Sequence, residues 1–173
     1  MKKVYIIFFL ISSLCAHPHT FIDVYPTIRV NDASSSVVNF KWVLDDMTST
    51  ILIMELDSNG DGKISEKENL FIEKEYFSIF QDYDYYTYIF FDGKKVKLPE
   101  PENFRATIEN NKICYSFDIK LSSNIRNITI EFGDSSYYVS MVLKTKFVKA
   151  EGLLIKVTDV DNDLYYGYRL ELK

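Results

Sequence analysis

The sequence predicts an α+β protein whose mostly antiparallel β-sandwich is interrupted once by a helix–loop–helix insertion. Hydrophobic residues alternate with period two over most of the 173 residues, but recur at helical spacing between about residues 45 and 81. The 13 Tyr and 13 Phe residues add to this prediction because aromatic side chains are enriched in strands. An apolar fraction of 47% excludes a disordered chain. Because no repeat or linker divides the sequence, we expect a single domain over residues 17–173.

Each strand is predicted from its own alternation. In the first strand, Ile22 and Val24 share one face and Asp23 lies on the other. Pro26 donates no ladder hydrogen bond, which favours an edge position for this strand. The second strand runs to about Leu44. The remaining predicted strands cover residues 85–91, 94–98, 104–109, 112–121, 125–132, 137–143, 152–158 and 164–172.

The first predicted helix covers residues 46–56. Asp45 or Asp46 is able to cap its start, because a carboxylate there accepts the free backbone N–H groups. The apolar residues that recur at helical spacing in this segment are Met47, Ile51 and Met54.

The second predicted helix begins near Ser65 and continues to about Gln81. Ser65 and Glu68 form a capping-box pattern, in which each side chain bonds the other residue's backbone N–H. The residues that supply its apolar surface are Leu70, Phe71, Phe77 and Phe80.

The amino-terminal residues 1–16 have the pattern of a secretory signal peptide. A short basic start is followed by an apolar run over residues 4–14, which is shorter than the roughly 20 residues of a membrane-spanning helix. We expect cleavage after Ala16, and no membrane span in the mature chain. Lipidation of Cys15 is the second alternative, because Leu14 is larger than the residue that usually precedes a lipidated cysteine.

Composition narrows the chemistry of the exported domain. The signal segment carries two lysines and no acidic residue, so its removal changes the net charge from −5 to −7. An acidic chain is unsuited to nucleic acid or anionic membranes, whereas it suits divalent cations. Two histidines and two cysteines are too few for most zinc-finger or disulfide frameworks. We expect Cys114 to be an unpaired thiol on a strand.

Residues 57–68 match the twelve-residue EF-hand calcium loop, which makes the insertion a helix–EF-hand loop–helix unit. Calcium takes 6–8 oxygen ligands, and Gly62 stands where the loop must turn sharply. The expected calcium ligands are Asp57, Asn59, Asp61, the backbone carbonyl of Lys63, Ser65 directly or through water, and Glu68 with both oxygens.

Two departures suggest a structural calcium site in place of a sensor. Asn69 stands where the outgoing helix often has an apolar residue, and no second loop of this pattern exists. Residues 159–163 alternate acidic side chains, but Leu164 replaces the required glycine, so we expect a hairpin turn there.

Both histidines lie at the start of the mature chain. If cleavage follows Ala16, the amine and imidazole of His17 can chelate a metal, with His19 and Asp23 as further ligands. Nitrogen-rich sites of this kind suit Cu(II), Ni(II) or Zn(II). The alternative is a frayed terminus with two solvated imidazoles, so this hypothesis depends on the cleavage position.

Four segments resemble a known family: His17-Pro18-His19-x-Phe21-Ile22-Asp23, Trp42-x-x-Asp45-Asp46-Met47, the loop at residues 57–68, and Asp134-Ser135-Ser136-Tyr137-Tyr138-Val139. They are similar to the uncharacterised exported bacterial proteins grouped as domain of unknown function 1007, often labelled the periplasmic component of an ABC-type transport system. Asp46 and Ser135 replace a more usual glutamate and proline. The resemblance implies a periplasmic location and association with an inner-membrane metal permease, including nickel (Ni2+) or cobalt (Co2+) exporters. An approach of Asp134 and Tyr137 to the histidine end is a further hypothesis.

We therefore expect a periplasmic calcium-binding protein that serves as a metal-binding accessory or solute-binding component of a transport system, and not an enzyme. The second hypothesis is a non-catalytic interaction module stabilised by Ca2+ alone. The third is a copper enzyme with an amino-terminal histidine brace, which ranks lowest because no paired acid–base arrangement is evident.

Overall fold

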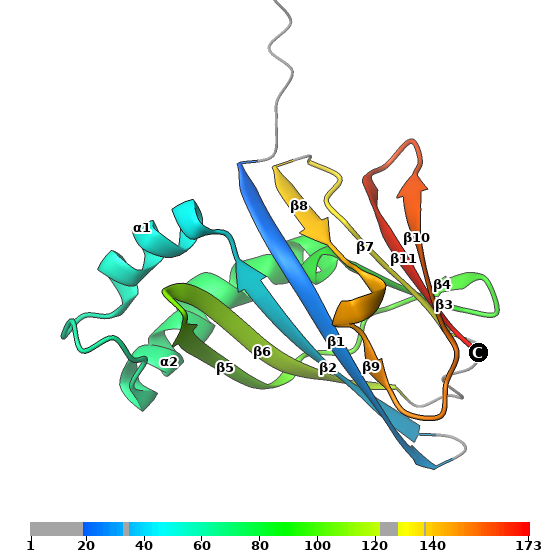
Figure 1. The fold of residues 1–173 in the computed structure, drawn as a ribbon, viewed down its shortest axis with the longest axis horizontal. Coiled ribbons are helices and arrows are strands. Elements are labelled where there is room, and N and C mark those ends of the chain that lie inside the picture. Colours follow the sequence, from blue (N-terminus) through cyan, green and yellow to red (C-terminus); the bar gives the residue numbers. More distant parts are fainter. Residues whose placement is uncertain (1–18, 33–34, 122–127, 137) are drawn as a thin grey trace, which may run out of the picture.

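The computed structural model describes residues 19–32, 35–121, 128–136 and 138–173, which contain two β-sheets and two α-helices (Figure 1). The mixed α+β class is confirmed by this composition of elements. The predicted export segment at residues 1–16, and His17 after it, lie outside the described residues. No helix in the described ranges is long and apolar enough to cross a bilayer.

Sheet A contains six strands. Five lie in the order β5-β6-β2-β1-β8. The short β9 also pairs with β1, further along that strand than β8 does. Neighbours are antiparallel except that β8 and β9 run parallel to β1. The strand bounds are β1 Thr20–Asp32, β2 Ser35–Leu44, β5 Glu102–Glu109, β6 Lys112–Leu121, β8 Val139–Val142 and β9 Lys149–Ala150.

The prediction that the first strand lies at a sheet edge is wrong. β1 has β2 on one side and both β8 and β9 on the other. β8 pairs with β1 as far as Asp23, and β9 pairs from Thr27 onward. Pro26 falls in the gap between these two partners, so its missing N–H costs no ladder hydrogen bond on that side.

Sheet B contains five strands in the order β10-β11-β7-β3-β4. Their bounds are β3 Thr87–Phe91, β4 Lys94–Val96, β7 Ile128–Gly133, β10 Ile155–Asp161 and β11 Tyr166–Leu172. β10 runs three residues later than the predicted 152–158, so the β10–β11 turn begins at Asn162. The Asn162 side chain accepts hydrogen bonds from the backbone N–H groups of Leu164 and Tyr165 at 2.8 and 3.0 Å. The predicted hairpin is confirmed, with Asp159 and Asp161 paired in strand β10.

The two sheets share one hydrophobic core. Burial alternates strictly along β2, with every second side chain buried. Phe40 of β2 meets Phe132 of β7 edge to face, with ring centroids 5.6 Å apart. Trp42 is fully buried against Phe117, with centroids at 5.0 Å. Aromatic side chains therefore fill the space between the sheets, as the strand-rich composition predicts.

Helices α1 (Asp46–Leu56) and α2 (Glu66–Ile72) lie between β2 and β3 in the chain, beside the β5–β6 end of sheet A (Figure 1). The second predicted helix is shorter than expected. After Ile72 the chain forms a π-helical turn (Glu73–Phe77) and then a 3₁₀ segment (Ser78–Tyr86). Phe77 is 3% exposed and stacks on Phe104 at 4.3 Å. The wider turn therefore coincides with burial of an aromatic ring in the core.

The apolar residues whose spacing predicted α1 do not form its buried face. Met47, Ile51 and Met54 are 63%, 55% and 75% exposed. The buried face instead contains Ser49, which is fully buried. Its hydroxyl donates to the Leu44 carbonyl at 3.2 Å and accepts from the Ile113 N–H at 3.0 Å. These two hydrogen bonds orient α1 against β6 with its methionines outward.

Candidate functional site

The loop between α1 and α2 is organised by Asp57, the residue that follows α1. Its carboxylate accepts hydrogen bonds from the backbone N–H of Asp61 at 3.1 Å and of Gly62 at 2.8 Å. These contacts curl the chain around the carboxylate, which belongs to a residue only 9% exposed. Gly62 has φ of +77°, a conformation that L side chains rarely adopt, so the turn requires glycine.

Two further predicted ligands support the same curl. Asn59 Oδ1 accepts from the Asp61 N–H at 3.1 Å, and Asp61 Oδ1 accepts from the Lys63 N–H at 2.9 Å. The Asn59 amide also donates to Asp61 Oδ2 at 3.0 Å. Each side chain thus bonds backbone or side chain two residues on, which is the turn chemistry typical of Asn and Asp.

Glu68 connects the two ends of the loop. Its Oε2 accepts from the Ser65 N–H and hydroxyl at 2.8 and 2.7 Å, and the Ser65 hydroxyl caps the Glu68 N–H. The predicted capping box is therefore confirmed. Its Oε1 accepts from the Ser58 hydroxyl at 2.7 Å and from the Ser58 N–H at 2.8 Å. The Ser58 hydroxyl, followed by the donors of Ser65, lowers the pKa of Glu68 to about 2.

Ser58 is a contact that the sequence pattern did not predict. It occupies the second loop position, which the calcium-loop pattern leaves unrestricted. Only the folded loop brings its hydroxyl to a carboxylate ten residues away. It contributes two of the four hydrogen bonds that Glu68 accepts from the two serines, so it helps to keep this carboxylate ionised.

The donor chemistry of the loop fits calcium. Asp57, Asn59, Asp61, Ser65 and Glu68 offer oxygen atoms alone, and three of them are carboxylates, which a hard cation prefers. The side chains are not gathered as a coordination shell, because Glu68 is directed to its two serine partners. Within the described ranges, no three His, Cys, Asp or Glu side chains converge in a group that could hold a metal ion.

The amino-terminal candidates are separated along β1. The His19 N–H donates to the Tyr138 carbonyl at 2.9 Å, and its imidazole stacks on the Tyr138 ring at 5.6 Å. Asp23 lies four residues further along an extended strand, or about 13 Å away at about 3.3 Å per residue. The structure therefore does not bring His19 and Asp23 together. His17 and Tyr137 lie outside the described residues.

Asp45 links the start of β1 to α1. Its Oδ2 accepts from the Phe21 N–H at 2.8 Å, and its Oδ1 accepts from the Thr48 N–H at 2.9 Å, which confirms Asp45 as the helix cap. Burial opposes ionisation of this carboxyl, but the backbone N–H donors of Thr48 and Phe21 outweigh it and lower its pKa. This carboxylate is therefore occupied in joining two elements.

Asp134 organises the turn before β8 in the same way. It is 2% exposed and accepts hydrogen bonds from the N–H groups of Ser136, Tyr138 and Val139 at 2.8, 3.0 and 2.9 Å. The same turn carries the Tyr138 carbonyl, which accepts a hydrogen bond from the His19 N–H. Asp134 therefore does approach the histidine end, but its role is to hold the turn.

Three of the four recognised segments thus meet at the amino-terminal end of β1, which lies beside the start of β8 (Figure 1). Together with the acidic loop, they define the chain as a two-sheet α+β protein with a calcium-type loop sequence between its helices. The chain belongs to the family described as "Protein of unknown function (DUF1007)", which it matches over residues 4–159.

Two relatives are themselves uncharacterised. The chain is 30% identical over 111 residues to "Uncharacterized 15.5 kDa protein in trpE 3'region" of Spirochaeta aurantia, covering 62% of this chain and 76% of that protein. It is 26% identical over 144 residues to "Uncharacterized protein" of Haemophilus influenzae (strain ATCC 51907 / DSM 11121 / KW20 / Rd), covering 80% of this chain and 68% of that protein. The family membership predicted from the four segments is confirmed, and neither relative's name mentions transport.

Proposed function

We propose that this protein is an exported calcium-binding protein whose site is the loop between α1 and α2. The observation that carries the proposal is the run of oxygen donors at residues 57–68, set between two helices and turned by Gly62. The ligands would be the side chains of Asp57, Asn59, Asp61, Ser65 and Glu68 with the Lys63 carbonyl. Calcium would replace the serine donors as the partner of Glu68 and neutralise three nearby carboxylates.

The proposed affinity is that of an extracellular calcium module, with a dissociation constant of about 10⁻⁴–10⁻³ M. Glu68 supports this range, because its low pKa leaves the carboxylate ionised at neutral pH, while the serine contacts must be exchanged for the ion. A site of this kind stabilises the fold in proportion to RT ln(1 + [Ca²⁺]/Kd), which is about 2.7 kcal/mol at 100 times Kd.

Calcium titration by calorimetry, with thermal unfolding measured in parallel, tests the proposal. We expect saturable binding and a rise in Tm for the unaltered chain, and loss of both in Asp57→Ala and in Glu68→Gln. Asp161→Ala is the matched control, because Asp161 is an exposed acid in the β10–β11 hairpin. Calcium binding that survives both loop substitutions, or that Asp161→Ala weakens equally, would refute the assignment of the loop.

The biological role within this proposal is that of a metal-binding accessory, or solute-binding component, of a periplasmic metal transport system. The export-type segment at residues 1–16 supports the location, and the proposed role is binding without catalysis. A transition metal such as Ni2+, Co2+, Cu2+ or Zn2+ would bind at His17 and His19. Asp23 is too far from His19 along the strand to complete that site with it.

Intact-mass measurement of the exported protein tests the histidine site first. A mature chain beginning at His17 should bind one transition-metal ion below micromolar Kd, and His19→Ala should weaken that binding. Calcium affinity should stay unchanged in His19→Ala, because His19 is remote in sequence from the loop and stacks on Tyr138. A mature chain that begins elsewhere, or that takes up no transition metal, would exclude this site.

A second candidate function is a calcium-stabilised interaction module with a protein partner. It is favoured by the exposed side chains of Met47, Ile51 and Met54 on α1, because solvent-facing apolar residues grouped on one helix often mark an interface. Calcium binding without transition-metal uptake, together with a partner lost in Met54→Gln, would favour it over the transport role.

A further inference from the structure

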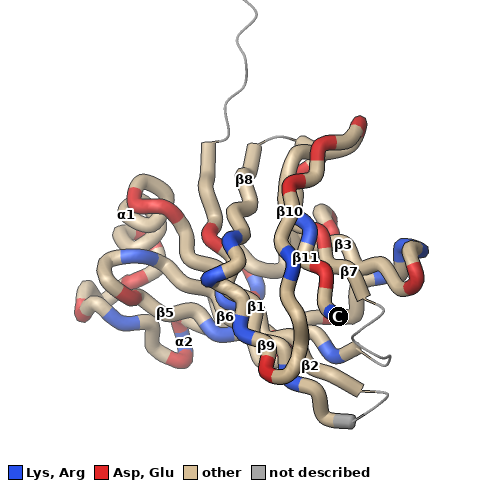
Figure 2. Tube along the Cα trace, turned by 45° about the vertical axis from the view of Figure 1, so that its right-hand side comes forward, with Lys and Arg blue, Asp and Glu red and all other residues tan. Residues whose placement is uncertain are grey.

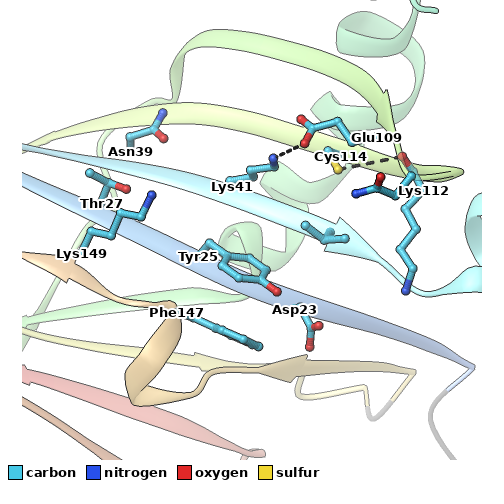
Figure 3. A pocket seen from close by; sticks show the side chains of 12 residues that line it. Asp23, Tyr25, Thr27, Asn39, Lys41, Glu109, Lys112, Cys114, Phe147 and Lys149 are labelled. Atoms are coloured by element: carbon cyan, nitrogen blue, oxygen red, sulfur yellow. Dashed lines mark hydrogen bonds and ion pairs between the residues drawn. The ribbon is translucent and has the colours of Figure 1, made fainter.

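A polar cleft crosses the face of sheet A that is turned away from the core (Figure 3). It has a volume of about 570 Å³, within the range of small-molecule sites. Side chains of β1, β2 and β6 form its floor, and the 3₁₀ turn Thr145–Phe147 with β9 forms one wall. Phe147 of that wall stacks on Tyr25 of the floor, with ring centroids 4.1 Å apart. The cleft thus has an aromatic side, built from residues far apart in the chain.

Three lysines line this cleft, and their charges are neutralised to different degrees. Lys41 forms an ion pair with Glu109 at 2.6 Å within the cleft. Lys112 reaches Asp46 at 3.2 Å, but the Asp46 side chain is 87% exposed, so water screens this pair. Lys149 has no acidic partner within ion-pair distance among the residues that the structure describes. The charge of Lys149 is therefore available to a ligand, and Lys112 can exchange its water-screened contact with Asp46 for a ligand carboxylate.

The positions of these charges define which part of the cleft attracts an anion. Lys149 lies beside Thr27 at one end of the cleft, whereas Lys112 lies at the other end, and Tyr25 lies between them (Figure 3). Asp23 lies near the Lys112 end, where its negative charge offsets part of that lysine's attraction for an anion (Figure 3). Figure 2 shows Lys and Arg along the central strands of sheet A, while acidic residues gather on the helices and at the β10–β11 tip. In a chain with net charge −5, these basic residues supply the local attraction for an anion on this face.

The uncharged groups of the cleft suit a carbon skeleton. Tyr25, Val43 and Phe147 present apolar surface, and the Thr27 hydroxyl is a neutral hydrogen-bonding group. Burial, followed by the charge of Asp23, raises the pKa of Tyr25, so its hydroxyl remains a donor at neutral pH. Cys114 in the floor is 1% exposed, and burial raises the pKa of its thiol. Cys114 is therefore a packing residue of the floor and does not act as a nucleophile.

We propose that this cleft binds a small organic dicarboxylate or tricarboxylate, with one carboxylate at Lys149 and Thr27, a second directed to Lys112, and the carbon chain over Tyr25. Three observations combine: two cations without a buried acidic partner, an aromatic surface between them, and a volume that inorganic phosphate does not fill. Long-range attraction guides the anion, and contact with the ammonium groups holds it.

The test is calorimetric titration with succinate and with tricarballylate in calcium-free, low-salt buffer. We expect saturable binding that weakens at 1 M salt, where the screening length falls to about 3 Å. Lys149→Gln should weaken binding about tenfold, the size of one lost charge-assisted hydrogen bond. Lys120→Gln is the control, because Lys120 is 61% exposed on β6, outside the cleft, and pairs with Glu102.

The outcomes separate this inference from the calcium proposal. Asp57→Ala should keep full carboxylate binding, since the loop lies outside the cleft. The proposal is overturned by any of three results: no binding of either acid, equal weakening in Lys120→Gln, or binding of phosphate or the diamine putrescine that matches succinate. Lys149 is exposed and contributes nothing to the core, so Lys149→Gln should keep the Tm of the unaltered chain. Measuring that Tm shows that any loss of binding is not a loss of folding.

Discussion

Asn69, the residue that departs from the usual calcium-loop pattern, should stabilise the fold by joining α2 to sheet A. Its side chain is 6% exposed and lies against β5, the terminal strand of that sheet. Its Oδ1 accepts from the Ala106 N–H at 2.7 Å, and its Nδ2 lies 3.5 Å from the Phe104 carbonyl. Because β5 has no neighbouring strand on its outer side in the sheet order of the described residues, the Asn69 amide contacts backbone groups that such a strand would otherwise pair with. We predict that Asn69→Ala destabilises the protein substantially.

The magnitude follows from these two contacts. The bond to Ala106 is short, and Ala106 is 2% exposed, so water does not replace the lost acceptor. A stranded buried donor costs about 1–3 kcal/mol, whereas the 3.5 Å contact is long and adds little. We therefore expect Asn69→Ala to lower the free energy of unfolding by about 2 kcal/mol. For a domain of this size that corresponds to a fall in Tm of about 4–8 °C.

Urea unfolding followed by circular dichroism measures this change, with calorimetry as an independent record of Tm. Lys67→Ala is the matched control, since it lies two residues away on the exposed side of α2 and should shift stability by less than about 0.5 kcal/mol. If Asn69→Ala costs no more than Lys67→Ala, the amide does not hold α2 to β5 and the reasoning is refuted.

Three other predictions concern a titration and two buried contacts. The pKa of Glu68 is lowered from 4.5 to about 2, so its contribution to stability is present above pH 4.5 and lost as the pH falls toward 2. Tm should therefore fall over that interval in calcium-free buffer, and Glu68→Gln should fall less; parallel curves would contradict this. Ser49→Ala should cost about 2 kcal/mol in urea unfolding, because the buried Ile113 N–H loses its acceptor, and an unchanged midpoint would contradict it. Gly167→Ala should cost about 3 kcal/mol, because the new methyl overlaps the Phe132 carbonyl; a soluble variant with unaltered Tm would disprove that contact.

Local patterns predicted most of the elements correctly. The β2 strand ends at Leu44 as predicted, and β6 covers the predicted residues 112–121. These strands follow directly from period-two burial, which depends on the side-chain direction of an extended chain. The capping box at Ser65 was also predictable, because it needs residues only three apart.

Predictions failed where distant residues decide the outcome. The second helix stops being α-helical at Ile72, although its apolar pattern continues, and the π-helical turn that follows buries Phe77 against Phe104 of β5. The outward face of α1 is set by Ser49, which hydrogen-bonds Ile113 across 64 residues of sequence. No window of local sequence contains such partners, so hydrophobic spacing alone predicts the helix but not which of its faces is buried.

The candidate sites show the same division. The oxygen donors of the loop are predictable because a calcium loop is a continuous stretch with fixed spacing. The cleft on sheet A was not predicted, since Tyr25 and Phe147 come together only when β9 joins β1. Asp134 is an intermediate case, because its segment is recognisable in the sequence but its hydrogen bonds to the turn are visible only in the structure.

The sequence by itself determined the family, the α+β class, the alternation of the strands and the order of oxygen-bearing side chains in the acidic loop, because each depends on residue type and short spacing. Only the tertiary structure decided which strands are neighbours, which helix face is buried, and where lysines and aromatic rings form a cleft. The physical reason is that these features arise from contacts between residues distant in the chain. Such contacts depend on how the two sheets and the helices pack, and on which polar groups that packing leaves without water.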